Sequence, residues 1–188
     1  MMPPQTILAW MWAALGIYWI AGAFQSRKTT LGERSLVRRL RLILLVVMFM
    51  LLLTDHLRFG WLGSRFVPRV PWLEWLGIAL TAAGFALCVW ARIHLGQYWS
   101  DKIGLKADHR LIRSGPYATL RHPIYSGVLL AITGSTLAIG EWRCVVVFAV
   151  MLVNYCIKAA REDRLLAAAF GDAFREHARQ AGFLLPRL

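Results

Sequence analysis

Five long apolar stretches constrain the fold of this chain more than any other feature. Ile7–Phe24 and Ile124–Gly140 contain no charged residue over 18 and 17 positions, and Trp72–Ala91 contains a single one. A transmembrane helix needs about 20 mostly apolar residues, and lipid admits only helices or closed barrels. With 58% hydrophobic residues and a mean hydropathy of +0.51, the sequence predicts an all-α integral membrane protein that forms a single helical domain over residues 1–188. We expect about five transmembrane helices, over residues 6–24, 38–57, 72–92, 124–140 and 142–158.

The last two predicted helices are separated only by Gly140–Arg143, so we expect them to form a tight antiparallel hairpin. Gly127, Ala131 and Ser135 recur at four-residue spacing in the first of them, a pattern that lets a neighbouring backbone approach closely. The apolar run of the second helix is only 14 residues long. Flanking residues such as Arg143 are therefore expected to extend it by snorkelling to the membrane interface.

The positive charge of the chain is unevenly distributed. The formal net charge is +12, and 18 of the 22 lysines and arginines fall in three segments, 27–41, 92–121 and the tail from residue 158. In the predicted topology these segments share one side of the membrane, which the positive-inside rule makes the cytoplasmic side. We therefore expect an N-terminus outside and a C-terminus in the cytoplasm, in a plasma or inner membrane. Membrane lipids, and not nucleic acid, are the expected partners of this charge.

A polar and aromatic segment, Ser114–Gly127, interrupts the apolar pattern just before the fourth predicted helix, and its sequence is SGPYATLRHPIYSG. Pro123 suits the first turn of a helix, whose free N–H groups can receive an anionic group. Tyr117 and Tyr125 can flank a flat ring, and Arg121 can pair with a carboxylate or phosphate. The alternative is an interfacial belt of aromatic residues with a snorkelling arginine.

A second charged cluster, Lys158, Arg161, Glu162 and Asp163, follows the fifth predicted helix. We expect that helix to continue into the cytoplasm, which brings this cluster close to Ser114–Gly127 at one end of the hairpin. Lys158 and Glu162 are then i, i+4 neighbours that can pair on one face. Either they form a surface ion pair that contributes little, or these charges beside the membrane belong to a functional site.

The sequence indicates neither a metal site nor a soluble nucleotide-binding fold. Cys88, Cys144 and Cys156 have no metal-ligand or redox spacing and suit packing positions. The chain has no GxGxxG, P-loop, HExxH or GxSxG arrangement. Beyond Gly171 we expect a membrane-surface helix over the cytoplasmic mouth. The two segments expected on the cytoplasmic side, residues 93–123 and 158–188, are where we expect a binding site.

The segment GPYATLRHPIYSG, followed by an acidic pair and then LLAAAFGDAF, resembles the isoprenylcysteine carboxyl methyltransferase and phospholipid methyltransferase family of integral membrane enzymes. The family pattern is similar to G-x-Y-x-x-x-R-H-P-x-Y-x-G, then E-E-x-x-L-x-x-x-F-G-x-x-Y after the last helix. The match extends from His109 to Phe174, about a third of the chain. The resemblance implies S-adenosylmethionine in a cytoplasmic pocket and a lipophilic substrate that enters from the bilayer.

The resemblance and the residue types together give a set of candidate cofactor-binding residues: His109, Arg110, Leu111, Ile112, Gly115, Tyr117, Arg121, His122, Pro123, Tyr125 and Glu162. Gly115 and Gly127 are expected to let the backbone approach the ligand closely. The candidate catalytic residues are Glu162, Lys158 and Arg161. Glu162 is expected to assist electrostatically near the cofactor, and Lys158 or Arg161 to orient a carboxylate acceptor. An amine acceptor would have to be deprotonated, with His122 or Glu162 as the expected base.

Three positions depart from the family pattern. Asp163 stands in place of the second glutamate, Phe174 in place of the usual tyrosine, and Lys158 where the eukaryotic enzymes have an arginine. A lysine lacks the bidentate recognition of carboxylates that an arginine provides. The departures leave the acceptor open between an isoprenylcysteine-type carboxylate and a lipid amine.

We therefore expect S-adenosylmethionine-dependent methyl transfer to a lipophilic acceptor at the cytoplasmic face of the membrane. Two alternatives stay open. Membrane reductases of the sterol reductase-like group carry a similar Arg-His-Pro-x-Tyr segment but bind NADPH. A non-catalytic membrane scaffold would keep the fold and bind neither cofactor.

Overall fold

The computed structural model describes residues 2–23, 35–54, 58–96 and 110–187 of the chain. These residues form six α-helices: α1 (Pro4–Ala23), α2 (Ser35–Leu53), α3 (Pro71–Leu95), α4 (Pro123–Ile139), α5 (Trp142–Phe170) and α6 (Asp172–Gln180). Two short 3-10 turns, η2 (Gly60–Gly63) and η4 (Gly115–Ala118), and two isolated β-bridges complete the described part. The predicted all-α class is confirmed. The predicted helix boundaries at residues 24 and 57 lie outside the described residues.

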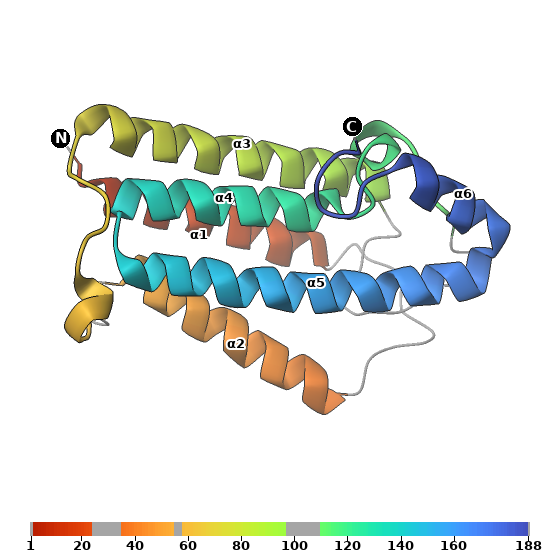
Figure 1. Cartoon of the computed structure of the whole chain (residues 1–188), viewed down its shortest axis with the longest axis horizontal. Coiled ribbons are helices and arrows are strands. Elements are labelled where there is room, and N and C mark those ends of the chain that lie inside the picture. Colours follow the sequence, from red (N-terminus) through yellow and green to blue (C-terminus); the bar gives the residue numbers. More distant parts are fainter. Residues whose placement is uncertain (1, 24–34, 55–57, 97–109, 188) are drawn as a thin grey trace.

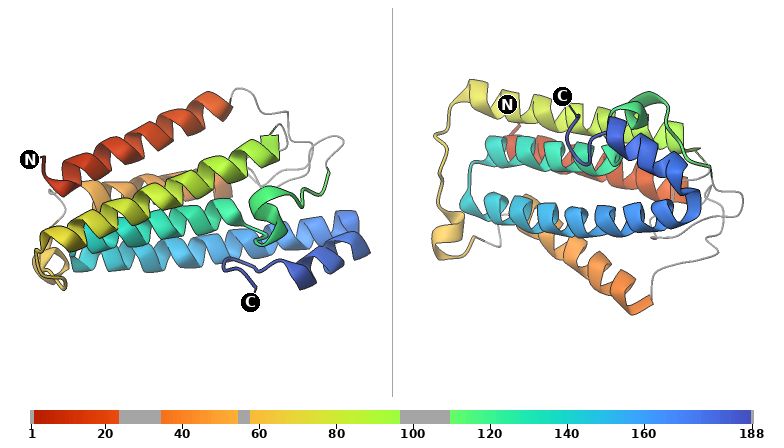
Figure 2. Two further views of the ribbon diagram at one scale, coloured as in Figure 1. Left: turned by 90° about the horizontal axis from the view of Figure 1, so that it is seen from above. Right: turned by 45° about the vertical axis from the view of Figure 1, so that its right-hand side comes forward.

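The five long helices lie side by side along the length of the molecule and alternate in direction, with α2 inclined to the others (Figure 1). The start of α2, the end of α3, the start of α4 and all of α6 therefore share one end, called here the site end. The turn η2 and the α4–α5 connection lie at the opposite end. At Gly171, where φ is +53°, the chain reverses, so that α6 and the C-terminal segment fold back beside the last turns of α5 (Figure 2).

Several helices have the character of membrane spans. Among the described residues, α3 and α5 are long and apolar enough to cross a membrane, and α4 is a shorter apolar helix of 17 residues. Large apolar side chains on α1 and α2 point outward, including Ile17, Ile20, Leu40 and Ile43, each more than half exposed. A surface of this kind favours lipid as the surrounding solvent. That all five long helices cross the membrane stays a prediction.

Helices α3 and α4 pack backbone against backbone at paired glycines. A side-chain carbon added at Gly84 would lie 2.4 Å from the carbonyl oxygen of Gly127, and one added at Gly127 would lie 2.6 Å from that of Gly84. Gly77 and Gly134 repeat the arrangement two turns away, with 2.5 Å in each direction. The predicted close approach of a neighbouring backbone is thus confirmed, and α3 is that neighbour. The further expectation that Gly127 faces a ligand is wrong, because α3 fills its open side.

Replacing Gly84 with alanine is expected to lower the stability of the bundle by about 1–3 kcal/mol, because the added methyl group forces the two backbones apart. Gly16→Ala is the matched control, since Gly16 lies inside α1 with nothing within 4 Å of an added side-chain carbon. There the better helix propensity of alanine should leave the melting temperature equal or slightly higher. Thermal unfolding in detergent measures both. Equal melting temperatures for the two variants would argue against the close α3–α4 contact.

A tryptophan joins helices α1 and α2 to the α3–α4 pair. Trp12 of α1 donates a hydrogen bond from Nε1 to Ser135 Oγ of α4 over 3.1 Å. Its ring also makes edge-to-face contacts with Phe49 of α2 and Phe85 of α3, each with ring centroids 4.7 Å apart. Four helices therefore meet at one side chain, which fixes α1 and α2 against the α3–α4 pair.

Arg143 closes the end of the bundle opposite the site end, and its side chain is fully buried. Its Nε donates to Glu141 Oε2 over 2.6 Å, and Nη1 donates to the carbonyls of Leu51 and Thr54 over 2.5 and 2.6 Å. The expectation that Arg143 snorkels to the interface is therefore wrong. The guanidinium instead satisfies carbonyl groups at the C-terminal end of α2, which otherwise have no helical partner.

Candidate functional site

The segment Ser114–Gly127 forms a compact turn that leads into α4. Gly115 opens η4 with a φ of +57°, a conformation that favours glycine, and a side-chain carbon there would lie 2.4 Å from the imidazole of His94. Pro123 occupies the first turn of α4, as predicted, and is buried. Gly115 is thus required by the turn and by the packing of His94 at the end of α3.

This turn meets α5 in a polar cluster, called here the carboxylate cluster. Tyr125 donates a hydrogen bond to Glu162 Oε1 over 2.7 Å, and His122 Nε2 lies 2.8 Å from Asp163 Oδ1. Arg121 Nη1 lies 3.3 Å from Asp163 Oδ2. The predicted continuation of the fifth helix beyond the apolar run, and its meeting with the turn segment, are both confirmed by these contacts. The members of the cluster are Arg121, His122, Tyr125, Lys158, Glu162 and Asp163.

His122 lies between the two carboxylates. Its Nε2 faces Asp163, and its Nδ1 lies 3.6 Å from Glu162 Oε2. Burial acts to lower the pKa of His122, but the hydrogen bonds and charges of Asp163 and Glu162 outweigh burial and raise the pKa above its ordinary value. Only the imidazolium form carries a donor on both ring nitrogens. The geometry therefore favours a protonated His122 that holds the two carboxylates together.

The protonation of His122 predicts a pH dependence of stability. A group whose pKa is raised on folding contributes stability that is fully present below its unfolded pKa of about 6.5 and is lost as the pH rises through the folded pKa. We expect the melting-temperature difference between wild type and His122→Gln to narrow as the pH rises from about 6 to about 9. His177 is present in both proteins, so its own titration cancels. A difference that is constant or widens over this range would contradict the charged state of His122.

Aromatic rings extend the cluster along α4 and α5. The rings of His122 and Tyr125 stack at 5.5 Å with an interplanar angle of 8°, and Tyr125 stacks on Tyr155 at 4.9 Å and 18°. The ammonium of Lys158 lies 5.1 Å from the centre of the Tyr125 ring, within the range of a cation–π contact. Lys158 and Glu162 thus face the same tyrosine from successive turns of α5, so both belong to the carboxylate cluster.

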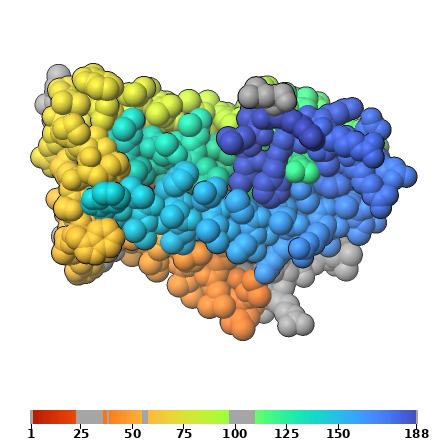
Figure 3. Space-filling view, viewed as in Figure 1, coloured from red at the N-terminus to blue at the C-terminus, as the bar shows by residue number. Residues whose placement is uncertain are grey.

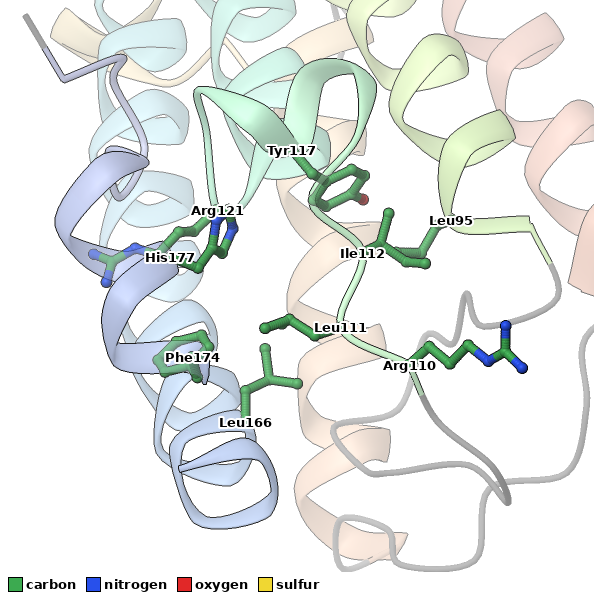
Figure 4. Close-up of a pocket in the computed structure, with 9 residues that line it drawn as sticks. All are labelled: Leu95, Arg110, Leu111, Ile112, Tyr117, Arg121, Leu166, Phe174 and His177. Atoms are coloured by element: carbon green, nitrogen blue, oxygen red, sulfur yellow. The ribbon is translucent and has the colours of Figure 1, made fainter. Parts of the chain in front are cut away.

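A groove lies beside the cluster, between η4, α5 and α6, with about 400 Å³ of empty volume including its open mouth. Its lining residues are Leu95, Arg110, Leu111, Ile112, Tyr117, Arg121, Leu166, Phe174 and His177. Leu111, Leu166 and Phe174 are directed toward one another, whereas the side chain of Arg110 is directed away from them (Figure 4). Arg113 donates a hydrogen bond to the carbonyl of Ala173, which ties the segment before η4 to α6.

The groove and the carboxylate cluster are electrostatically coupled. Arg121 belongs to both, since it lines the groove and faces Asp163. Burial, followed by the negative charge of Glu162, raises the pKa of Tyr117 well above its ordinary value, so this phenol stays protonated and can donate a hydrogen bond. Burial, followed by the positive charges of Arg113 and Arg121, lowers the pKa of His177. The groove is therefore lined by cationic side chains, and through Arg121 it adjoins the carboxylate cluster.

The structure separates the predicted site residues into groups. Arg110, Leu111, Ile112, Tyr117 and Arg121 line the groove, whereas His122, Tyr125, Lys158 and Glu162 form the cluster beside it. His109 lies outside the described residues. Arg161 is exposed on α5. The roles assigned to all of these residues stay predictions.

Sequence reasoning missed four residues that line the groove: Leu95, Leu166, Phe174 and His177. Phe174 and His177 are both buried and lie three residues apart on α6. This i, i+3 spacing places them on one helix face, which was the available signal. Leu166 occupies the leucine position of the E-E-x-x-L part of the family pattern, which was its available signal. For Leu95 no local pattern distinguishes a groove-lining leucine from the other leucines of the bundle.

Comparisons with known proteins agree with this arrangement. A sequence model of the isoprenylcysteine carboxyl methyltransferase (ICMT) family matches residues 75–168, half of the chain. The chain is 32% identical over 146 residues to the cobalt-zinc-cadmium resistance protein CzcN of Cupriavidus metallidurans, covering 76% of this chain and 61% of that protein. It is 24% identical over 187 residues to a probable protein-S-isoprenylcysteine O-methyltransferase of Oryza sativa, covering 95% of each.

Among solved structures, the fold is similar to that of the eukaryotic intramembrane Ras methyltransferase ICMT. The TM-score is 0.61 at 20% sequence identity, over 79% of this chain and 52% of that protein. The chain spans about three fifths of the length of the first curated relatives it matches. The matched residues 75–168 include most of α3, the turn segment, α4 and the part of α5 that carries both carboxylates. By this match the chain belongs to the isoprenylcysteine carboxyl methyltransferase family.

Proposed function

We propose that this protein is an S-adenosylmethionine-dependent methyltransferase that modifies a lipophilic acceptor at the cytoplasmic face of a membrane. The observation that carries the proposal is the pairing of a groove with a carboxylate cluster through a shared residue, Arg121. Family membership supports the reaction class. The excess of lysine and arginine in the segments bordering the site end supports a cytoplasmic location.

The residues of the site fit the chemistry of this cofactor. A flat adenine can be held by Tyr117 and Phe174, which line the groove together with aliphatic side chains. A carboxylate fits the guanidinium of Arg121, which is a strong partner for such groups. A sulfonium or an ammonium can pair with the carboxylates of Glu162 and Asp163 in the adjoining cluster. The groove and the carboxylate cluster therefore together offer aromatic, cationic and anionic partners for the corresponding groups of the cofactor.

When bound, S-adenosylmethionine supplies a methyl group on a cationic sulfur. Transfer would form a bond from the acceptor's lone pair to the methyl carbon and return the carbon–sulfur electron pair to sulfur, so in-line placement of the acceptor would be the main demand on the protein. We assign to Glu162 the binding and orientation of the cofactor's cationic groups, which would align the methyl group with the acceptor. His122 and Tyr125 hold Glu162 in place through their contacts with its two oxygens.

The acceptor class decides whether a base is needed. A carboxylate acceptor becomes a neutral ester without losing a proton, and in that case Lys158 or Arg161 orients it. An amine acceptor must lose a proton. A protonated His122 cannot accept that proton, so Glu162 is the candidate base for an amine. The buried ammonium of Lys158 favours an anionic acceptor beside it.

The proposal is tested by a methyl-transfer assay with S-adenosylmethionine carrying a labelled methyl group. Purified protein in detergent or vesicles is offered prenylcysteine analogues, amine-bearing phospholipids and a total lipid extract in separate reactions. We expect label in one lipophilic product class, and none with heat-inactivated protein. Binding of the cofactor with no transfer to any of these acceptors would contradict a methyltransferase that acts on a lipophilic substrate.

A further inference from the structure

The C-terminal segment Ala181–Leu184, called here the strap, is bound to the turn that carries the site. The strap's Gly182 donates its N–H to the carbonyl of Thr119 over 2.9 Å, and its carbonyl accepts the N–H of Arg121 over 2.8 Å. Ser126 Oγ donates to the carbonyl of the strap's last residue over 2.6 Å. In the space-filling view, the C-terminal end of the chain lies over the first turns of α4 (Figure 3). The strap is thus held on both sides of Arg121 and His122.

Phe183 is the strap residue that touches the carboxylate cluster. Its ring meets the imidazole of His122 edge to face, with centroids 5.4 Å apart and an interplanar angle of 79°. The guanidinium carbon of Arg121 lies 5.3 Å from the centre of the same ring. One aromatic side chain therefore contacts the two neighbouring cations that pair with Asp163. Both kinds of contact depend on an aromatic ring at this position.

These contacts restrict how His122 can turn. Tyr125 stacks on one face of the imidazole, Phe183 meets it at a steep angle, and the two ring nitrogens face Asp163 and Glu162. A ring freed from Phe183 could rotate and lose one of the two carboxylates, because rotation about this last side-chain bond is broad for a histidine. Arg121 would lose a partner in the same step.

We propose that Phe183 is a positioning residue of the site, and that the strap holds Arg121 and His122 in the orientation needed for cofactor binding. The inference rests on the proposed function for its binding readout. It adds to that function a segment beyond the matched family region, which ends at residue 168. Phe183 acts through Arg121 and His122 and is not itself assigned a contact with the reacting groups.

The binding test compares Phe183→Leu with Phe183→Tyr. Leucine keeps an apolar side chain but removes the ring, whereas tyrosine keeps the ring. We expect the leucine variant to bind S-adenosylmethionine about tenfold more weakly, and the tyrosine variant to bind like wild type. Leu185→Ala, an exposed position just beyond the strap, is the control and should be unchanged. Wild-type affinity in the leucine variant, or an equal loss in both Phe183 variants, would overturn the proposal.

A second measurement does not depend on the cofactor. Hydrogen exchange of the full chain in detergent should show slow exchange at the amides of Arg121 and Gly182, which donate within the strap contact. Ser126→Ala removes one anchor with little change of volume and should speed exchange at both. Fast exchange at these amides in wild type would show that the strap is not bound to the turn and would overturn the proposal. If wild type binds no S-adenosylmethionine, the proposed function fails, while the exchange result still decides whether the strap exists.

Discussion

Replacing Glu162 with glutamine is expected to lower kcat/KM for methyl transfer at least about 100-fold, because the cofactor loses a charged partner that aligns it and a small misalignment of reacting groups costs about that much. Glutamine keeps the size of the side chain and can still accept the hydrogen bond from Tyr125. It removes the negative charge that faces His122 and that we assign to the cofactor's cationic end. The change is therefore expected to weaken S-adenosylmethionine binding as well as to slow transfer.

The matched control is Glu176→Gln on α6. Glu176 is exposed, and its carboxylate accepts a hydrogen bond from Gln180 one turn later. Kinetics with labelled cofactor and melting temperatures of both variants separate loss of function from loss of fold. We expect a normal melting temperature with little activity for Glu162→Gln, and wild-type melting temperature and activity for Glu176→Gln. Activity within about threefold of wild type in Glu162→Gln would remove Glu162 from the proposed mechanism.

The largest loss of stability is expected for Arg143→Ala, about 3–5 kcal/mol, the range for breaking a buried ion pair by removing one partner. After the change, Glu141 still pairs with Arg58, whose Nη2 lies 2.8 Å from Glu141 Oε1, but it has lost its pairing with Arg143. It also leaves the carbonyls of Leu51 and Thr54 at the end of α2 without this donor. Helix α2 should then detach first, because its C-terminal end is held by this guanidinium.

Arg175→Ala provides the comparison, since Arg175 forms a largely exposed i, i+3 pair with Asp172. Pairs of that kind contribute about 0–1 kcal/mol. Unfolding in detergent should show a much lower midpoint for Arg143→Ala and an unchanged one for Arg175→Ala. Arg143 lies in the first turn of α5, and that end of α5 is opposite the site end (Figure 1), so the Arg143 variant should still bind cofactor at low temperature. An Arg143→Ala protein as stable as wild type would contradict a stabilising role for the buried contacts of Arg143 with Glu141 and the end of α2.

Much of the site could be predicted because its signals are local. The proline at the first turn of α4 and the spacing from Lys158 to Glu162 are read from a few neighbouring residues. The meeting of Tyr125 with Glu162 followed from the short connection between α4 and α5, which brings their far ends together. Residues close in sequence, or joined by a short hairpin, have few alternative arrangements.

The features that were missed depend on partners far away in the chain. Arg143 was expected to snorkel because its sequence neighbours do not reveal the end of α2, 89 to 92 residues away. The glycine face of α4 predicted a close contact but not α3 as its partner. Phe183 and the strap have no periodic pattern, because they bind through backbone hydrogen bonds and a single ring. Such contacts are set by tertiary packing, which local propensity does not encode.

The most direct test of the central claim is isothermal titration of the purified full chain in detergent, first with S-adenosylmethionine and then with NADPH. We expect S-adenosylmethionine to bind at one site per chain, the Glu162→Gln variant to bind it much more weakly, and NADPH not to bind. Binding of NADPH without S-adenosylmethionine would identify a membrane reductase, and binding of neither would indicate a scaffold. Either result would contradict the proposed methyltransferase.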